Sequence, residues 1–204
     1  MRASVIEETK SPKEEFSMSK AIPIFAILSL TCGVLLFVFI KSGLMSIEDS
    51  FSFANPFKLL VSSLIASIGL IVFGVVLTLI TPTKFVDDTN KTYQNEPLFN
   101  IIIFMFLAVL FEEFLFRGII QGYIFHTFNN YWAAIIGTTV LFTVYHFQYF
   151  KKPLMLFNLV VPAFVFCWIY FYSSNLLVPI ATHFLMNVGM TLLFKYNLIK
   201  LKES

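Results

Sequence analysis

Three ionisable side chains lie inside a long apolar stretch, and they limit the folds open to this chain. The stretch runs from Leu98 to Phe125 and contains Glu112, Glu113 and Arg117. An ionisable group at membrane depth costs roughly 2.5–3.5 kcal/mol on insertion scales, so it is rarely kept without a function. On a helix, Glu113 and Arg117 lie one above the other, and this spacing suits an ion pair. Glu112 is rotated by about 100° from Glu113, which leaves it available for proton chemistry.

The composition is that of a polytopic membrane protein. Of the 204 residues, 58% are hydrophobic and 13% are charged, whereas a soluble domain has about 25% charged residues. We expect an all-α, polytopic integral membrane bundle of about six transmembrane helices, each near the ~20 residues that cross a bilayer. The predicted spans are 21–40, 59–80, 97–125, 131–149, 154–172 and 176–194, forming one membrane domain over 21–194. A polar tail of 1–20 precedes the domain, and a basic tail of 195–204 follows it.

The distribution of Lys and Arg predicts the orientation of these spans. Eleven of them fall on the side that holds both termini, and two fall on the other side. Both termini are therefore expected in the cytoplasm. The segment before 21–40 lacks the short basic region of a signal peptide, so that stretch is interpreted as a retained span. Cys32 and Cys167 each lie in an apolar run and are interpreted as buried free thiols.

Small residues predict where helices pack closely. Ser63, Ser67 and Gly74 share one face of the second span, and Gly118 and Gly122 follow the charged motif. Such patterns let a neighbouring helix approach.

Two further spans carry polar side chains of the kind used in catalysis. His146 ends the fourth span in Phe142-Thr-Val-Tyr-His146, and His183 and Asn187 lie four apart in the sixth. Each has a simpler interpretation: His146 as a headgroup anchor, and His183 with Asn187 as an interhelical hydrogen-bond pair. The simpler interpretation of the Glu113–Arg117 pair is that it only holds two helices together. His126 is predicted to lie in a turn, solvated and uninvolved.

Taken together, these residues are the parts needed to hydrolyse an acyl bond. A carboxylate can take a proton from water, and an imidazole can orient that water or protonate the leaving amine. An imidazole or amide N–H can hold the developing oxyanion. No Ser or Cys has an obvious nucleophile context, which favours activated water over an acyl-enzyme. Glu112, His146 and His183 could also ligate zinc, although the His-Glu-x-x-His spacing is absent. The cofactor is left open between a divalent metal and none.

Three motifs in order resemble the CPBP family of CAAX proteases and bacteriocin-processing enzymes. Glu112-Glu113-Phe-Leu-Phe-Arg117 is similar to its EExxxR motif, Phe142-x-x-x-His146 to FxxxH, and His183-x-x-x-Asn187 to HxxxN, within a core of 97–190. The resemblance implies a glutamate-dependent intramembrane endopeptidase. It also implies that Glu112 activates water with His146, and that His183 and Asn187 form an oxyanion hole. By the same resemblance, Glu113 and Arg117 hold the site together.

The expected function is therefore hydrolysis of a peptide bond in a peptide or membrane-protein substrate. The expected setting is a bacterial cell membrane, with no nucleic acid partner and an oligomeric state that the sequence leaves open. The alternatives are a bacteriocin self-immunity or toxin- or solute-binding membrane protein that acts without proteolysis, and an inactive scaffold. Counting along the spans puts Glu112 near mid-membrane and His146 nearer the cytoplasmic end. If these groups meet, the helices must tilt or the cavity must open toward the cytoplasm.

Overall fold

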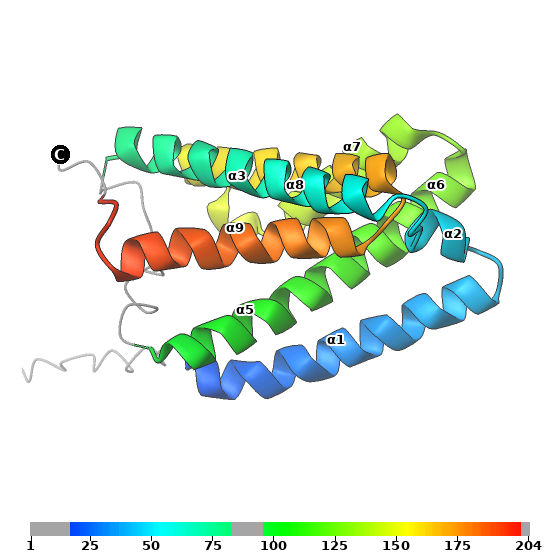
Figure 1. The fold of residues 1–204 in the computed structure, drawn as a ribbon, viewed down its shortest axis with the longest axis horizontal. Helices are drawn as coiled ribbons and strands as arrows, with labels where there is room; N and C mark the ends of the chain where they lie inside the picture. The colour runs from blue at the N-terminus through cyan, green and yellow to red at the C-terminus, as the bar shows by residue number, and fades with distance from the viewer. Residues whose placement is uncertain (1–16, 83–95, 201–204) are drawn as a thin grey trace, which may run out of the picture.

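The computed structural model describes residues 17–82 and 96–200, and this part of the chain is a bundle of helices with no β-strand (Figure 1). The elements are α1 (Met18–Lys41), α2 (Ile47–Ser50), α3 (Pro56–Ile80), α5 (Leu98–Glu113), the π-helix η2 (Phe114–Gln121), α6 (Gly122–Phe128), α7 (Tyr131–Tyr145), the 3-10 helix η3 (Phe147–Tyr149), α8 (Pro153–Ser173) and α9 (Leu177–Lys195). The predicted all-helical membrane bundle is confirmed.

Within the described residues, five helical segments are long and apolar enough to cross a membrane. They are α1, α3, the continuous run Leu98–Phe128, α8 and α9. The remaining predicted span is α7, which has 15 residues and is shorter than the others. The chain is an integral membrane protein.

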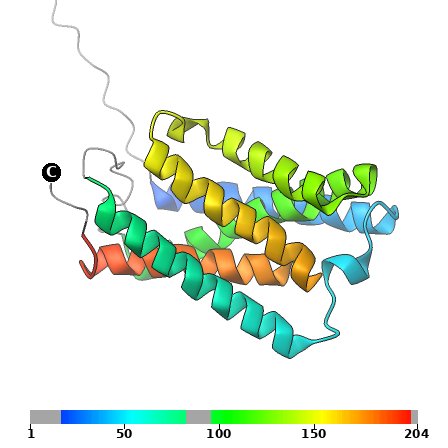
Figure 2. The same cartoon turned by 90° about the horizontal axis from the view of Figure 1, so that it is seen from above.

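Helix α9 lies at the centre of the bundle. It packs against α3, α5 and α8, while α1 lies along α5 and α7 lies along α8 (Figures 1 and 2). At one end of the bundle α1 and α5 begin and α3 and α9 end. A hydrogen bond of 2.8 Å from Lys195 Nζ to the carbonyl of Glu96 joins two of these helix ends. The central place of α9 puts His183 and Asn187 among helices that come from distant parts of the sequence.

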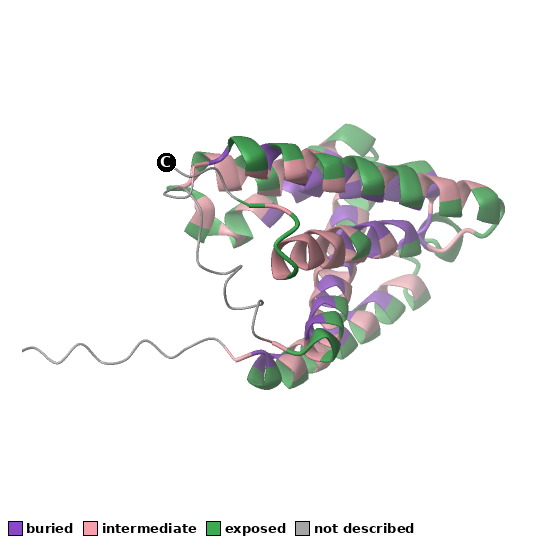
Figure 3. Ribbon diagram, turned by 60° about the vertical axis from the view of Figure 1, so that its left-hand side comes forward, coloured by how far each residue is buried: buried purple, intermediate pink, exposed green. Residues whose placement is uncertain are grey.

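The outer surface of the bundle is apolar. Large side chains on α1 and α3, such as Leu30 (71% exposed) and Ile65 (67% exposed), point away from the other helices. Exposed residues follow the outer faces of the helices, and buried residues follow the faces turned toward their neighbours (Figure 3). Lipid tails can cover such a surface, and helix association then depends on close packing and polar contacts.

The predicted packing face of α3 is present. Ser63, Ser67 and Gly74 are all buried. A Cβ atom on Gly74 would come within 3.0 Å of the sulfur of Met190 on α9. The small residues of α3 therefore make room for side chains of α9.

Gly118 and Gly122 also make room, although for side chains and not for a neighbouring backbone as predicted. A Cβ on Gly118 would lie 3.2 Å from a methyl group of Leu36 in α1. A Cβ on Gly122 would lie 2.7 Å from the terminal carbon of Met45. The reason is that α1 and the segment after it reach this face with bulky side chains that fill the space between the backbones.

Several predicted boundaries differ from the structure. Helix α1 begins at Met18, so part of the predicted tail is helical. Helix α7 ends at Tyr145, four residues before the predicted end, and η3 follows. His126 was predicted in a turn, but it lies exposed in the last turn of α6. The turn starts at Asn129, whose positive φ of 46° ends the helix. Residues 1–16, 83–95 and 201–204, which hold most of the predicted polar tails and one loop, lie outside the described residues.

A leucine at Gly118 is expected to destabilise the bundle, because its side chain would overlap Leu36 and Leu176. Overpacking of this kind costs about 1–3 kcal/mol. The control is Gly69→Leu, since Gly69 on α3 is exposed and nothing lies within 4 Å of its added Cβ. Thermal unfolding in detergent should show a lower Tm for Gly118→Leu and an unchanged Tm for Gly69→Leu. Equal Tm values for the two variants would contradict the packing described here.

Candidate active site

The charged motif lies where an α-helix widens into a π-helix. Glu112 and Glu113 are the last residues of α5, and Arg117 lies in η2. π-Helical turns inside α-helices occur frequently at functional sites. Glu113, Arg117 and Gln121 are each fully buried, whereas the side chain of Glu112 keeps 18% of its surface exposed. The two adjacent carboxylates thus have different surroundings.

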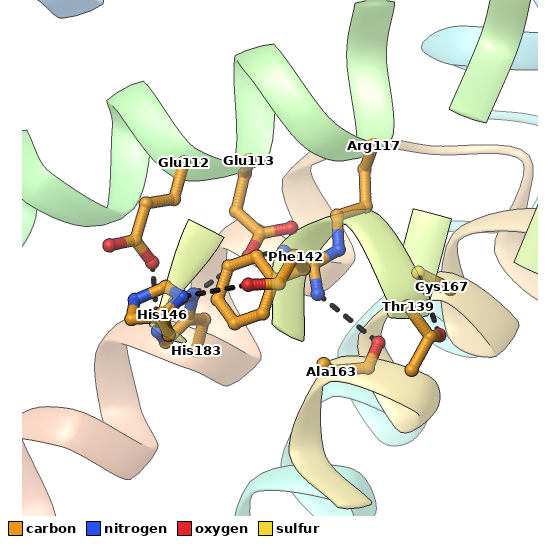
Figure 4. A network of polar contacts seen from close by, with 9 residues as sticks. All are labelled: Glu112, Glu113, Arg117, Thr139, Phe142, His146, Ala163, Cys167 and His183. Carbon is orange, nitrogen blue, oxygen red and sulfur yellow. Dashed lines mark hydrogen bonds and ion pairs between the residues drawn. The ribbon is translucent and has the colours of Figure 1, made fainter. Parts of the chain in front are cut away.

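One oxygen of Glu113 receives two hydrogen bonds. Arg117 Nη1 donates to Oε1 at 3.0 Å, so the ion pair that the four-residue spacing suggests is formed. His183 Nδ1 lies 2.7 Å from the same oxygen (Figure 4). An ionised carboxylate can only accept hydrogen bonds, so Nδ1 of His183 carries the hydrogen. Glu113 therefore joins α5, η2 and α9 at a single atom.

Two side chains of η2 bind the backbone of α8. Arg117 Nη2 donates to the carbonyl of Ala163 at 3.1 Å, and Gln121 Nε2 donates to the carbonyl of Cys167 at 2.9 Å. The donors are four residues apart, and so are the acceptors. This match fixes the register of α8 against η2, and with it the place of the side chains that α8 contributes to the site.

Phe142 connects His146 with Arg117. The carbonyl of Phe142 lies 2.9 Å from Nδ1 of His146, and the ring centroid lies 4.7 Å from the guanidinium carbon of Arg117. Because a carbonyl only accepts, Nδ1 of His146 carries the hydrogen and Nε2 is left for other partners. The first residue of the Phe142-x-x-x-His146 motif thus orients the imidazole and covers the guanidinium.

Phe166 of α8 has a similar double contact. Its ring stacks on the imidazole of His183, with centroids 4.6 Å apart and planes inclined by 22°. The same ring lies 5.3 Å from the guanidinium carbon of Arg117. The stacking and the bond to Glu113 hold His183 so that Nε2 lies 3.8 Å from Oε2 of Glu112.

The four candidate catalytic side chains line one cavity of about 420 Å³. Glu112 comes from α5, His146 from the end of α7, and His183 and Asn187 from α9. Thr81, Tyr149 and Phe194 also line the cavity, so it extends toward the end of the bundle where α3 and α9 end. The structure therefore brings the predicted residues together, and Glu113 and Arg117 lie behind them in the protein interior.

Glu112, His146 and His183, the candidate ligands if a metal binds, all line the cavity. Within residues 17–82 and 96–200, no three His, Cys, Asp or Glu side chains gather closely enough to hold a metal ion. One ring nitrogen of each histidine is already bonded, to Glu113 in one case and to the carbonyl of Phe142 in the other. Metal-ligating histidines commonly have one ring nitrogen bonded in this way, so these bonds do not exclude a ligand role for the other nitrogen.

Sequence reasoning missed three contributors to the site. The bond between His183 and Glu113 joins residues 70 positions apart, and no local pattern predicts it. Phe166 lies in a run of apolar residues, where nothing distinguishes it from a lipid-facing phenylalanine. Gln121 was not among the candidate residues either. The signal that could have identified it is a long amide side chain inside an otherwise apolar span.

Comparison with known proteins supports the motif analysis. The family described as type II CAAX prenyl endopeptidase Rce1-like matches residues 94–189. This region is similar to that family. The resemblance drawn from the three motifs is thereby confirmed, and the Rce1-like region contains every residue of the candidate site.

A curated relative matches a similar length of chain. It is the uncharacterized protein YpbD of Bacillus subtilis (strain 168), 28% identical over 109 residues. The alignment covers 52% of this chain and 53% of YpbD, so the chain matches about half the length of that relative. No solved structure matches the chain.

Replacing Arg117 by methionine is expected to lower the free energy of unfolding by about 3–5 kcal/mol, because Glu113 would keep a buried, uncompensated charge. The double variant Glu113→Gln/Arg117→Met removes both charges and should recover part of that loss. Chemical or thermal unfolding of the single and double variants in detergent measures both effects. A double variant less stable than Arg117→Met would contradict the pairing.

Proposed function

We propose that this protein is an intramembrane endopeptidase that hydrolyses a peptide bond of a peptide or membrane-protein substrate, using water activated by Glu112. The observation that carries the proposal is the convergence of Glu112, His146, His183 and Asn187 on one cavity. The Rce1-like region, whose family is named for endopeptidases, supports it. These groups arise from three helices distant in sequence, an arrangement that helix packing alone does not require.

Glu112 is the proposed general base. It is the one of the two adjacent glutamates that reaches the cavity, and its carboxylate has no guanidinium partner because Arg117 bonds to Glu113. A carboxylate in this position can take a proton from water as the oxygen attacks the substrate carbonyl. His146, with Nε2 left unbonded by Phe142, orients the water by accepting a hydrogen bond from it. The proton that Glu112 takes from the water passes to the leaving amine, directly or through Nε2 of His146, as the peptide C–N bond breaks.

His183 and Asn187 are proposed to stabilise the oxyanion. They lie four residues apart on α9 and line the cavity beside Glu112. The amide N–H of Asn187 can donate directly. His183 can donate from Nε2 when its ring is protonated, and the carboxylate of Glu113 at Nδ1 stabilises that charge. With Glu112 and Glu113 ionised, Arg117 and a protonated His183 make the group neutral overall.

Both termini are proposed to lie in the cytoplasm, on the basis of the Lys and Arg distribution. The cavity extends toward the end of the bundle where α1 begins and α9 ends. In this orientation the substrate would reach Glu112 from the cytoplasmic half of the membrane.

Replacing Glu112 by glutamine should reduce cleavage by about 10²–10⁴-fold, the usual contribution of a general base, while the protein still folds. Wild type, Glu112→Gln and the control Glu48→Gln, which changes an exposed glutamate of α2, are expressed at equal levels. Mass spectrometry of peptide termini should find new termini with wild type and Glu48→Gln that are missing with Glu112→Gln. Identical termini in all three would overturn the proposal, and a toxin-resistance phenotype retained by Glu112→Gln would then favour the binding alternative.

Replacing Asn187 by alanine should lower kcat by about 10²–10³-fold, the usual cost of losing one oxyanion donor. The control is Asn158→Ala, because Asn158 lines the same cavity from α8. KM should change little in either variant. Equal losses of kcat in the two variants would contradict an oxyanion role for Asn187.

A further inference from the structure

A proline interrupts the hydrogen bonds of α8 well away from either end of the helix. Pro162 lies inside α8 and is buried. Proline has no backbone N–H, so the carbonyl of Asn158, four residues earlier, does not receive the bond that an α-helix normally provides. No side chain of the described residues donates to this carbonyl. Helix α8 therefore has an acceptor in its interior that its own helical bonds leave unused.

The freed carbonyl lies on the face of α8 that lines the cavity. This face includes Asn158, Leu159, Pro162, Ala163 and Phe166. In an α-helix each carbonyl points along the axis toward the residue four positions later, so the carbonyl of Asn158 points toward Pro162. An unbonded backbone group at membrane depth is costly against lipid and is tolerated where it lines a cavity. A ligand in the cavity can therefore reach this oxygen.

The contacts of α8 fix the carbonyl relative to the catalytic side chains. Arg117 bonds to the carbonyl of Ala163, and Phe166 stacks on the imidazole of His183. Asn158 precedes Phe166 by about 12 Å along the helix axis. An extended peptide advances about 3.3 Å per residue, so roughly two to four substrate residues separate this carbonyl from the scissile bond.

A proline inside α1 has different surroundings. Pro23 is exposed and does not line the cavity. The carbonyl that it leaves without a helical partner belongs to Ser19, which is exposed in the first turn of the helix. Of these two prolines, Pro162 is therefore the one whose freed carbonyl meets the candidate active site.

We propose that the carbonyl of Asn158 accepts a hydrogen bond from a backbone N–H of an extended peptide substrate, about two to four residues from the scissile bond. The proposal rests on the proteolytic function proposed above. With Asn187 donating to the scissile carbonyl, the substrate backbone is bound at two points, and its register along the cavity is set. Every residue except proline offers a backbone N–H, so the contact selects against proline at one position and is indifferent to the other side chains. The side chain of Asn158 takes no part, so Asn158→Ala keeps the contact.

The test uses the full chain in detergent and a peptide that covers a bond identified by the terminus analysis above. In each of a series of analogues, one backbone N–H is replaced by an ester oxygen, which cannot donate a hydrogen bond. With wild type, the ester at one position near the cleaved bond should lower kcat/KM by about tenfold, as expected for the loss of one hydrogen bond. A proline at the same position should lower kcat/KM at least as much.

A variant of α8 shows whether the lost bond is the one to Asn158. Pro162→Ala supplies the missing N–H, which completes the helical bond and occupies the carbonyl. The parent peptide should then have a higher KM and nearly the same kcat, and the sensitive ester should be cleaved as fast as the parent. The matched control is Pro23→Ala, which also removes a proline from a helix and should keep the tenfold effect. Each variant is compared by its ratio of ester to parent rate, so a general change in activity cancels.

A uniform response would overturn this inference. If no ester position slows wild type, or if Pro162→Ala keeps the full ester effect, the carbonyl does not bind the substrate, while cleavage of the parent peptide leaves the proteolytic function standing. If wild type cleaves no bond, or if Glu112→Gln cleaves the parent peptide as fast as wild type, the proteolytic function fails and this inference fails with it.

Discussion

A single buried oxygen, Oε1 of Glu113, is the atom on which the rest of the site depends. It accepts from Arg117 at 3.0 Å and from His183 at 2.7 Å, and the same guanidinium binds the carbonyl of Ala163. A carboxylate inside an apolar bundle must be compensated, since an unpaired charge there is very costly. The contacts that meet this need also tie α5, η2, α8 and α9 together. The same bonds therefore compensate the buried charge of Glu113 and fix the positions of these helices relative to one another.

The two adjacent glutamates have different surroundings because helix geometry turns their side chains to different sides. Glu113 faces the protein interior and is fully buried, and Glu112 faces the cavity. If both faced inward, Arg117 would have two carboxylates to compensate. If both faced the cavity, His183 would lose the acceptor at Nδ1 that fixes its ring. The order of the two residues in the sequence therefore decides which one reaches the cavity.

The sequence predicted the parts of this molecule that depend on local spacing. The helical bundle, the buried face of α3 and the pairing of Glu113 with Arg117 all follow from periodicity and from the cost of charge in a membrane. The contact of His183 with Glu113 and the stacking of Phe166 could not be predicted, because they depend on which helices become neighbours. The π-helix was also missed, because the sequence of Phe114–Gln121 contains no proline that would mark a departure from an ordinary α-helix.

Helix α7 is short for a membrane span. Its 15 residues span about 22 Å, less than the ~30 Å of a hydrocarbon core. Tyr131 and Trp132 are exposed at its first turn, where aromatic side chains favour the membrane interface. His146 directly follows this short helix and lines the same cavity as Glu112. The irregular backbone of η3 that follows is tolerated at membrane depth only where it lines a cavity, as Tyr149 does.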